Sequence, residues 1–350
     1  MGLRSALSRF ADRAAVPVFA VAGGGAREAV GRLRQSPTVE LVDTPAAATI
    51  LLVAGFVSPD LSPALTAVHD AMPSPRGTMH WPLGADQRNL PTTPSAPPIG
   101  PSDDAADAIA HVFRALLSGA FPSEPPIQPN ADPNPWRGIG PYGQGGSGMT
   151  GGTPYGRPMA ELAPDRDGLR LDVLPLSVGP FFPRFPVGLT LEVSMAGDVA
   201  IEGRVTDSPF IGYGSSFLAG PFLRALSHPV PVAEIELARA REHLRWASNA
   251  LVTHGLPALA MRVLRLAEAA QSLELARRAG DRRTAQTGVV ESPRGRLQAH
   301  DAPFQRLQPL VPDLLAGLEW GDAVTALVSL DLDPEEAGAV AIPSARADAA

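Results

Sequence analysis

The sequence predicts an α/β N-terminal domain with a parallel, flavodoxin-like sheet, followed by an α+β C-terminal domain with a β-hairpin and a long helical hairpin. Short apolar runs alternate with helix-permissive stretches through residues 16–120, the pattern of a parallel sheet with helices on both faces. Residues 121–158 are rich first in proline and then in glycine, which favours a linker. From Pro231 onward, apolar residues recur with the period of a helix.

The N-terminal domain, residues 1–120, contains four predicted strands and three predicted helices. The strands are rich in β-branched and aliphatic residues and cover residues 16–21, 39–42, 49–57 and 77–81. The helices cover residues 26–33, the stretch from Ser62-Pro63 to Pro73, and residues 105–117. The last helix is amphipathic, and its apolar face consists of Ile109, Val112, Phe113 and Leu116.

The C-terminal domain, residues 159–336, begins with strand-like stretches at 169–174 and 188–193. The second stretch turns at Ala196-Gly197-Asp198 into residues 199–205, which predicts a β-hairpin. Two helices separated by Gly255-Leu256-Pro257 then predict an antiparallel hairpin. The stripe expected to be buried consists of Leu237, Ala240, Leu244, Ala247, Leu251, Leu259, Val263, Leu266, Ala270 and Leu273. From Gly288 we expect a short strand pair and two apolar stretches, and residues 337–350 are predicted to be disordered.

The composition excludes several classes of function. A net charge of −7 argues against a nucleic-acid partner, because phosphate contacts require a basic surface. No apolar run approaches the ~20 residues that a membrane-spanning helix needs. The chain contains no cysteine, which excludes a disulfide framework and leads us to expect a cytoplasmic protein.

Residues 48–76 carry a resemblance to a known family. A buried apolar strand ends in a glycine, a helix follows, and Met72-Pro73-Ser74-Pro75-Arg76 leads into the next strand. This order resembles the small, cluster-bearing subunit of respiratory complex I and of membrane-bound nickel–iron hydrogenases, in which the same strand–helix–strand segment occurs.

The second half resembles the large subunit of the same complexes, which forms the quinone chamber in complex I and holds the nickel–iron centre in hydrogenases. The matching segments are residues 238–246, 290–297, 302–308, 315–322 and 328–331. The resemblance implies a structural signature made of Glu291, Pro293, Arg294, Gly295 and Asp331. We expect Arg294 to pair with a carboxylate or with backbone carbonyls.

The chain departs from this family where the metal ligands should be. The hydrogenase-type cysteine pair after the first strand is replaced by residues 22–28, and His80 precedes a stretch without the expected cluster cysteine. The loop from Gly179 to Gly188 has phenylalanine and proline where complex I has quinone-binding histidines. The resemblance implies that this loop lies near the first half, where a cluster once faced the quinone or metal site. Because iron–sulfur and nickel–iron centres are held by thiolates, the resemblance implies that both cofactors are lost.

These observations predict a fused, non-catalytic structural or assembly subunit of a complex-I-like or nickel–iron-hydrogenase-like membrane oxidoreductase complex. Its expected partners are other subunits of that assembly, through which it would lie at the cytoplasmic face of the membrane. The alternative is an NADH-quinone-oxidoreductase-type subunit that retains a quinone or nucleotide pocket between its two domains. A free-standing protein without a partner complex is a third interpretation.

One weaker motif indicates a nucleotide site. Gly23, Gly24 and Gly25 follow a predicted strand and precede a helix, where backbone amides bind phosphate, and Asp43 lies where a ribose ligand is expected. The final glycine of the dinucleotide fingerprint is replaced by Glu28, whose carboxylate repels phosphate. A loop left over from the lost cluster site, without a ligand, is the favoured explanation of the glycines.

Overall fold

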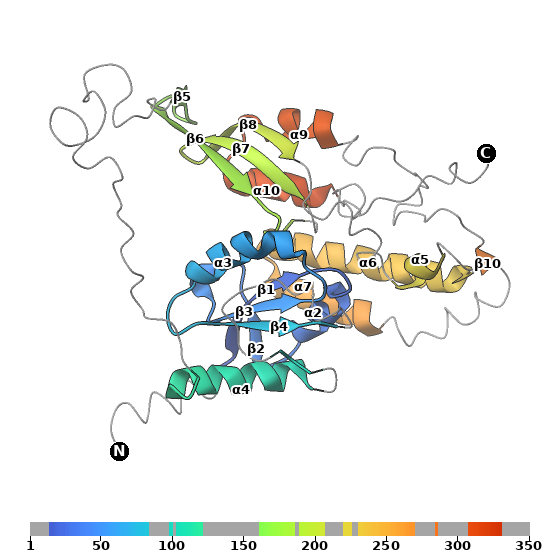
Figure 1. The fold of residues 1–350 in the computed structure, drawn as a ribbon. Helices are drawn as coiled ribbons and strands as arrows, with labels where there is room; N and C mark the ends of the chain where they lie inside the picture. The colour runs from blue at the N-terminus through green and yellow to red at the C-terminus, as the bar shows by residue number, and fades with distance from the viewer. Residues whose placement is uncertain are drawn as a thin grey trace, which may run out of the picture.

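The computed structural model contains two four-stranded sheets and the helices that cover them (Figure 1). It describes residues 14–83, 98–100, 103–121, 161–185, 189–206, 220–225, 230–269, 284–285 and 307–330. The first sheet is parallel and the second is antiparallel, which confirms the predicted combination of an α/β half and an α+β half.

The parallel sheet has the strand order β2-β1-β3-β4. Its strands are β1 (Val16–Ala22), β2 (Val39–Leu41), β3 (Ile50–Ala54) and β4 (Gly77–Trp81). All five residues of β3 are buried, because a strand at the centre of a helix-covered parallel sheet has no face toward water. From β1 the chain adds β2 on one side and then β3 and β4 on the other, so the strand order reverses between β1 and β3. Open α/β sheets bind ligands at such a reversal.

Helices cover both faces of the parallel sheet (Figure 1). On one face lie α2 (Arg27–Leu33) and α4 (Ala105–Ser118), and the predicted apolar face of α4 is buried there. On the other face lie α3 (Ser62–Asp70) and the N-terminal half of α6 (Val232–Thr253). The carboxylate of Asp104 caps α4 by accepting hydrogen bonds from two backbone amides, as expected for an N-cap aspartate. Two short 3-10 helices, Pro45–Ala47 and Pro59–Leu61, complete this half.

The antiparallel sheet has the strand order β5-β6-β7-β8. Its strands are β5 (Leu162–Pro164), β6 (Arg170–Val178), β7 (Thr190–Ala196) and β8 (Val199–Thr206). The predicted hairpin is confirmed as β7 and β8, which turn at residues 197–198. Two helices, α9 (Leu307–Leu315) and α10 (Trp320–Ser329), pack on one face and bury Leu191, Val193, Met195, Val311 and Leu327.

The predicted helical hairpin is confirmed as α6 and α7 (Pro257–Ala269), but its predicted apolar stripe is wrong in both helices. In α6, Ala240 is exposed, whereas Ala238 and Ser248 are buried. In α7, Leu259 and Leu266 are exposed, whereas Ala260, Leu264 and Ala267 are buried. The buried face of α7 is one residue out of phase with the expected stripe. Ala260 and Ala267 are small and allow α7 to approach α6 closely. The sequence prediction followed the larger leucines and therefore did not identify these alanines as buried.

Helix α6 connects the two halves. Ile235 and Ala238 join the core of the parallel sheet, while Ala250 packs against the core of the antiparallel sheet. The Trp246 indole N–H donates to the backbone carbonyl of Val328 in α10 at 2.8 Å. Helix α6 therefore packs against both sheets, although the predicted linker at residues 121–158 assigns it to the second half alone.

Several sequence predictions fall outside the described residues. They concern the 121–158 linker, the strand pair from Gly288, the 337–350 tail and the structural signature of Glu291, Pro293, Arg294, Gly295 and Asp331. Two short elements near these stretches are placed: α5 (Gly220–Ala225), and β9 (Val230–Pro231) paired antiparallel with β10 (Thr284–Ala285). None of the helices in the described segments has the length and apolarity to cross a membrane.

Candidate functional site

The loops that follow β1 and β3 cross at the carboxyl end of the parallel sheet. The Gly23 amide donates to the Ala54 carbonyl at 2.7 Å, and the Gly24 amide donates to the Phe56 carbonyl at 2.7 Å. The Phe56 amide returns a bond to the Gly24 carbonyl at 2.9 Å. Two amides of the glycine triplet are therefore already hydrogen-bonded within the protein. The nucleotide site at Gly23, Gly24 and Gly25 stays a prediction that this geometry does not favour.

The crossing of these loops requires a glycine at position 23. A Cβ atom on Gly23 would lie 2.0 Å from the Phe56 carbonyl oxygen, whereas a Cβ on Gly25 would meet nothing within 4 Å. We expect Gly23→Ala to lower the free energy of unfolding by about 2 kcal/mol, because the β3 loop has to move. The control Gly25→Ala, at φ 77°, should cost about 1 kcal/mol through backbone strain alone. Equal urea midpoints for the two variants would contradict the close approach.

The segment Gly179–Phe185 lies against this end of the sheet and contacts both cores. Phe181 packs on the core of the parallel sheet, whereas Phe182 and Phe185 belong to the core of the antiparallel sheet. The rings of Phe182 and Phe185 lie 4.6 Å apart, and Phe182 meets Trp320 edge-on at 6.1 Å. The expectation that this loop lies near the first half is confirmed for its described part.

Asp43, the predicted ribose ligand, forms an ion pair with Arg184 of the same loop. The backbone carbonyl of Arg184 also accepts a hydrogen bond from the Asn249 side-chain amide of α6 at 2.7 Å. Asp43 therefore ties the loop to the parallel sheet in this structure. Its predicted role as a ribose ligand has no support in this geometry and stays a prediction.

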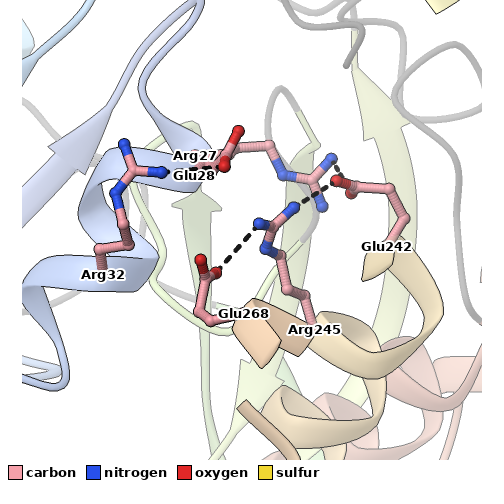
Figure 2. Close-up of polar contacts among 6 residues, drawn as sticks. All are labelled: Arg27, Glu28, Arg32, Glu242, Arg245 and Glu268. Carbon is pink, nitrogen blue, oxygen red and sulfur yellow. Dashed lines mark hydrogen bonds and ion pairs between the residues drawn. The ribbon is translucent and has the colours of Figure 1, made fainter. Parts of the chain in front are cut away.

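A network of ion pairs joins α2, α6 and α7 (Figure 2). Glu242 accepts from Arg27 at 2.8 Å and from Arg245 at 2.9 Å, and Arg245 also reaches Glu268 at 3.1 Å. The side chains of Arg245, Glu242 and Glu268 are only 13%, 14% and 15% exposed. Partial burial strengthens these charge-assisted hydrogen bonds relative to those in water.

A cavity of about 210 Å³ lies beside this network, between the two halves. A smaller cavity of about 120 Å³ adjoins it, and the two share Ala22, Val30, Arg34, Pro183 and Phe185 in their walls. Every charged residue that lines the larger cavity is an arginine: Arg27, Arg34, Arg184 and Arg245. This arginine-lined cavity is the candidate functional site.

Arg34 differs from the other three arginines of the cavity. Burial lowers the pKa of its guanidinium, with Asp43 opposing that effect and Arg184 adding to it. Among the described residues its side chain forms no ion pair, although it lies at the wall shared by both cavities. Sequence reasoning missed Arg34, Arg184 and Arg245 as a group, since they lie far apart along the chain and carry no spacing signal.

His80 lies within β4 and is 6% exposed. Removal from water lowers the pKa of His80 below its ordinary value of 6.5. The unfolded chain then takes up a proton near pH 6.5 that the folded chain does not. We therefore expect the free energy of unfolding to fall as the pH drops below about 6.5, and His80→Asn to lack this part of the pH dependence. A dependence unchanged in the variant, in urea titrations from pH 5 to pH 8, would contradict this assignment.

The described residues contain no cluster of three or more histidine, aspartate or glutamate side chains placed to hold a metal ion. No known protein-family model matches the chain, and no curated protein matches it.

Proposed function

We propose that this chain is a non-catalytic structural or assembly subunit of a complex-I-like or nickel–iron-hydrogenase-like membrane oxidoreductase complex. The resemblance described above supplies the lineage, and the absence of cysteine removes the usual cluster ligands. The packing supports this proposal, because the Gly179–Phe185 loop, which corresponds to the quinone loop of the resembled subunit, meets the sheet of the small-subunit-like half.

The observation that carries the proposal is an uncovered apolar surface on the antiparallel sheet. Leu174 and Leu176 of β6 pair with Met195 and Val193 of β7, and paired residues in antiparallel strands share one face. Met195 and Val193 are 5% and 1% exposed beneath α9 and α10, whereas Leu174 and Leu176 are 57% and 47% exposed. The same apolar face thus continues onto β6 without its helical cover.

Leu162 of β5 extends this surface. It pairs with Asp172, which lies two residues from Leu174 and therefore on the same face, and it is 49% exposed. Contiguous apolar residues on an exposed sheet face are typical of sites that contact another protein or a membrane. We assign this face, Leu162, Leu174 and Leu176, to a neighbouring subunit of the same assembly, which would hold the chain at the cytoplasmic side of the membrane.

The test is purification of the tagged full chain from its native cells under mild detergent, with its associated proteins identified by mass spectrometry. We expect membrane subunits and iron–sulfur subunits of one oxidoreductase complex in fixed ratio. The double variant Leu174→Gln/Leu176→Gln should lose these partners, while Ser177→Gln, exposed on the opposite face of the same strand, should retain them. Recovery of a lone chain, or equal retention by both variants, would overturn the proposal.

The second candidate is an NADH-quinone-oxidoreductase-type subunit with a quinone or nucleotide pocket between the two halves, where the arginine-lined cavity lies. The cavity volume of about 210 Å³ is below the ~300–1,000 Å³ of ordinary small-molecule pockets, so a whole dinucleotide does not fit. Its arginine-rich wall also differs from the apolar lining that a quinone ring prefers. A quinone or NAD pocket is therefore the less favoured of the two functions.

A further inference from the structure

We propose that the arginine-lined cavity between the two halves binds a small oxyanion, of the size of phosphate or a short dicarboxylate, with Arg34 as its principal contact. Four guanidinium groups line the cavity, and no carboxylate does. This binding site lies within the chain itself, so it goes beyond the proposed subunit role and does not depend on a partner complex.

The charge around the cavity is incompletely balanced. Arg27 and Arg245 share Glu242, Arg245 also contacts Glu268, and Arg184 pairs with Asp43. These four guanidinium groups, with Arg34 included, thus face three carboxylates. Arginine stays charged in proteins, so the surplus cannot be removed by loss of a proton and is best relieved by a bound anion.

Two arginines of the same cavity have donors for which the described residues supply no acceptor, and of these donors only the Arg245 Nε atom is fully buried. Arg34 forms no side-chain hydrogen bond or ion pair within the part of the chain that the structure describes. The Nε atom of Arg245 is buried without an acceptor among the described residues and lies 4.0 Å from the Cβ position of Gly31. A buried donor without an acceptor costs free energy, and an oxyanion supplies several acceptors at once.

The remaining polar groups of the wall are already used by the protein. Ser248 donates to the Ala260 carbonyl, Trp246 donates to the Val328 carbonyl, and the Asn249 amide donates to the Arg184 carbonyl. An anion would therefore be held mainly by guanidinium groups, which bind phosphate and carboxylate oxygens in a bidentate manner. The small volume restricts the ligand to a few heavy atoms.

The experiment is isothermal titration calorimetry of the full chain with inorganic phosphate and, separately, with succinate, at constant ionic strength set by sodium chloride. We expect saturable binding of one ion per chain for at least one of the two, and the one that binds identifies a phosphate-type or a carboxylate ligand. Arg34→Gln should weaken binding at least tenfold. Arg32→Gln should leave it unchanged, since Arg32 lies on the exposed side of α2 and pairs with Glu28.

A second variant keeps the test decisive if Arg34→Gln does not fold. Gly31→Leu places a side chain into the cavity, removes no charge and favours the helical conformation of α2. We expect it to fold, as judged by circular dichroism, and to bind neither ion. Absence of saturable binding in the parent chain, equal loss in Arg32→Gln and Arg34→Gln, or undiminished binding in Gly31→Leu would each overturn the proposal.

Discussion

Replacement of Glu242 by alanine is expected to lower the free energy of unfolding by about 3–5 kcal/mol, one of the two largest single-residue effects that we predict. Glu242 is the common acceptor of Arg27 and Arg245, and the Arg245 side chain is only 13% exposed. Without Glu242, Arg245 keeps Glu268 as its partner, but the charge between α2 and α6 is left uncompensated. The measurement is urea denaturation followed by circular dichroism.

Glu28→Ala is the matched control, because it removes a glutamate–arginine pair that is also drawn in Figure 2. Arg32 and Glu28 are 55% and 45% exposed and lie one turn apart on α2. Solvent screens such a pair, so its loss should cost at most about 0.5 kcal/mol. If Glu242→Ala lowered the free energy of unfolding as little as Glu28→Ala, the network would stabilise the fold no more than an exposed ion pair does.

Replacement of Phe185 by alanine is expected to lower the free energy of unfolding by about 3–5 kcal/mol, because it opens a cavity where the two halves meet. Phe185 is 7% exposed and lines both cavities. The centroid of its ring lies 4.6 Å from that of Phe182. Phe185→Leu should cost less than about 1.5 kcal/mol, because it keeps most of the volume. Thermal melts of the full chain provide the comparison.

Leu266→Ala serves as the surface control for Phe185→Ala, since Leu266 is 59% exposed on α7. The free energy of unfolding of this variant should stay within about 0.5 kcal/mol of that of the parent chain. This control also tests the correction to the helical hairpin, in which the sequence pattern placed Leu266 in the core. If Leu266→Ala lost as much free energy of unfolding as Phe185→Ala, Leu266 would be buried in solution, which would contradict the observed face of α7.

The elements that the sequence predicted well are those whose burial leaves a strong pattern. Residues 50–54 are buried on both faces, so β3 reads as an uninterrupted apolar run, and α4 has four large apolar residues on one face. The face of α7 was predicted wrongly because Ala260 and Ala267 form the close contact while its leucines face solvent. In the sequence, alanines at a helix–helix contact give a weaker periodic apolar signal than leucines do, even when the leucines are exposed.

The candidate site could not be predicted from the sequence. Arg34 follows a helix of the first half, Arg184 lies in a loop of the second, and Arg245 lies within a long helix. A single arginine in any of these positions is typical of a solvated surface. Only the packing of α6 against both sheets brings the three together, and no spacing rule anticipates such a long-range arrangement. The Gly179–Phe185 loop, by contrast, was placed near the first half by resemblance.

We propose that this chain keeps the packing framework of the resembled subunits without their metal centres, and elemental analysis is the test of this proposal. The full chain should be expressed and purified without oxygen, and its iron, nickel and acid-labile sulfide should be measured per chain. We predict that all three stay at background, because a chain without cysteine lacks the thiolates that hold these centres. Stoichiometric iron and sulfide, with visible charge-transfer absorption, would contradict the proposed loss of the metal centres.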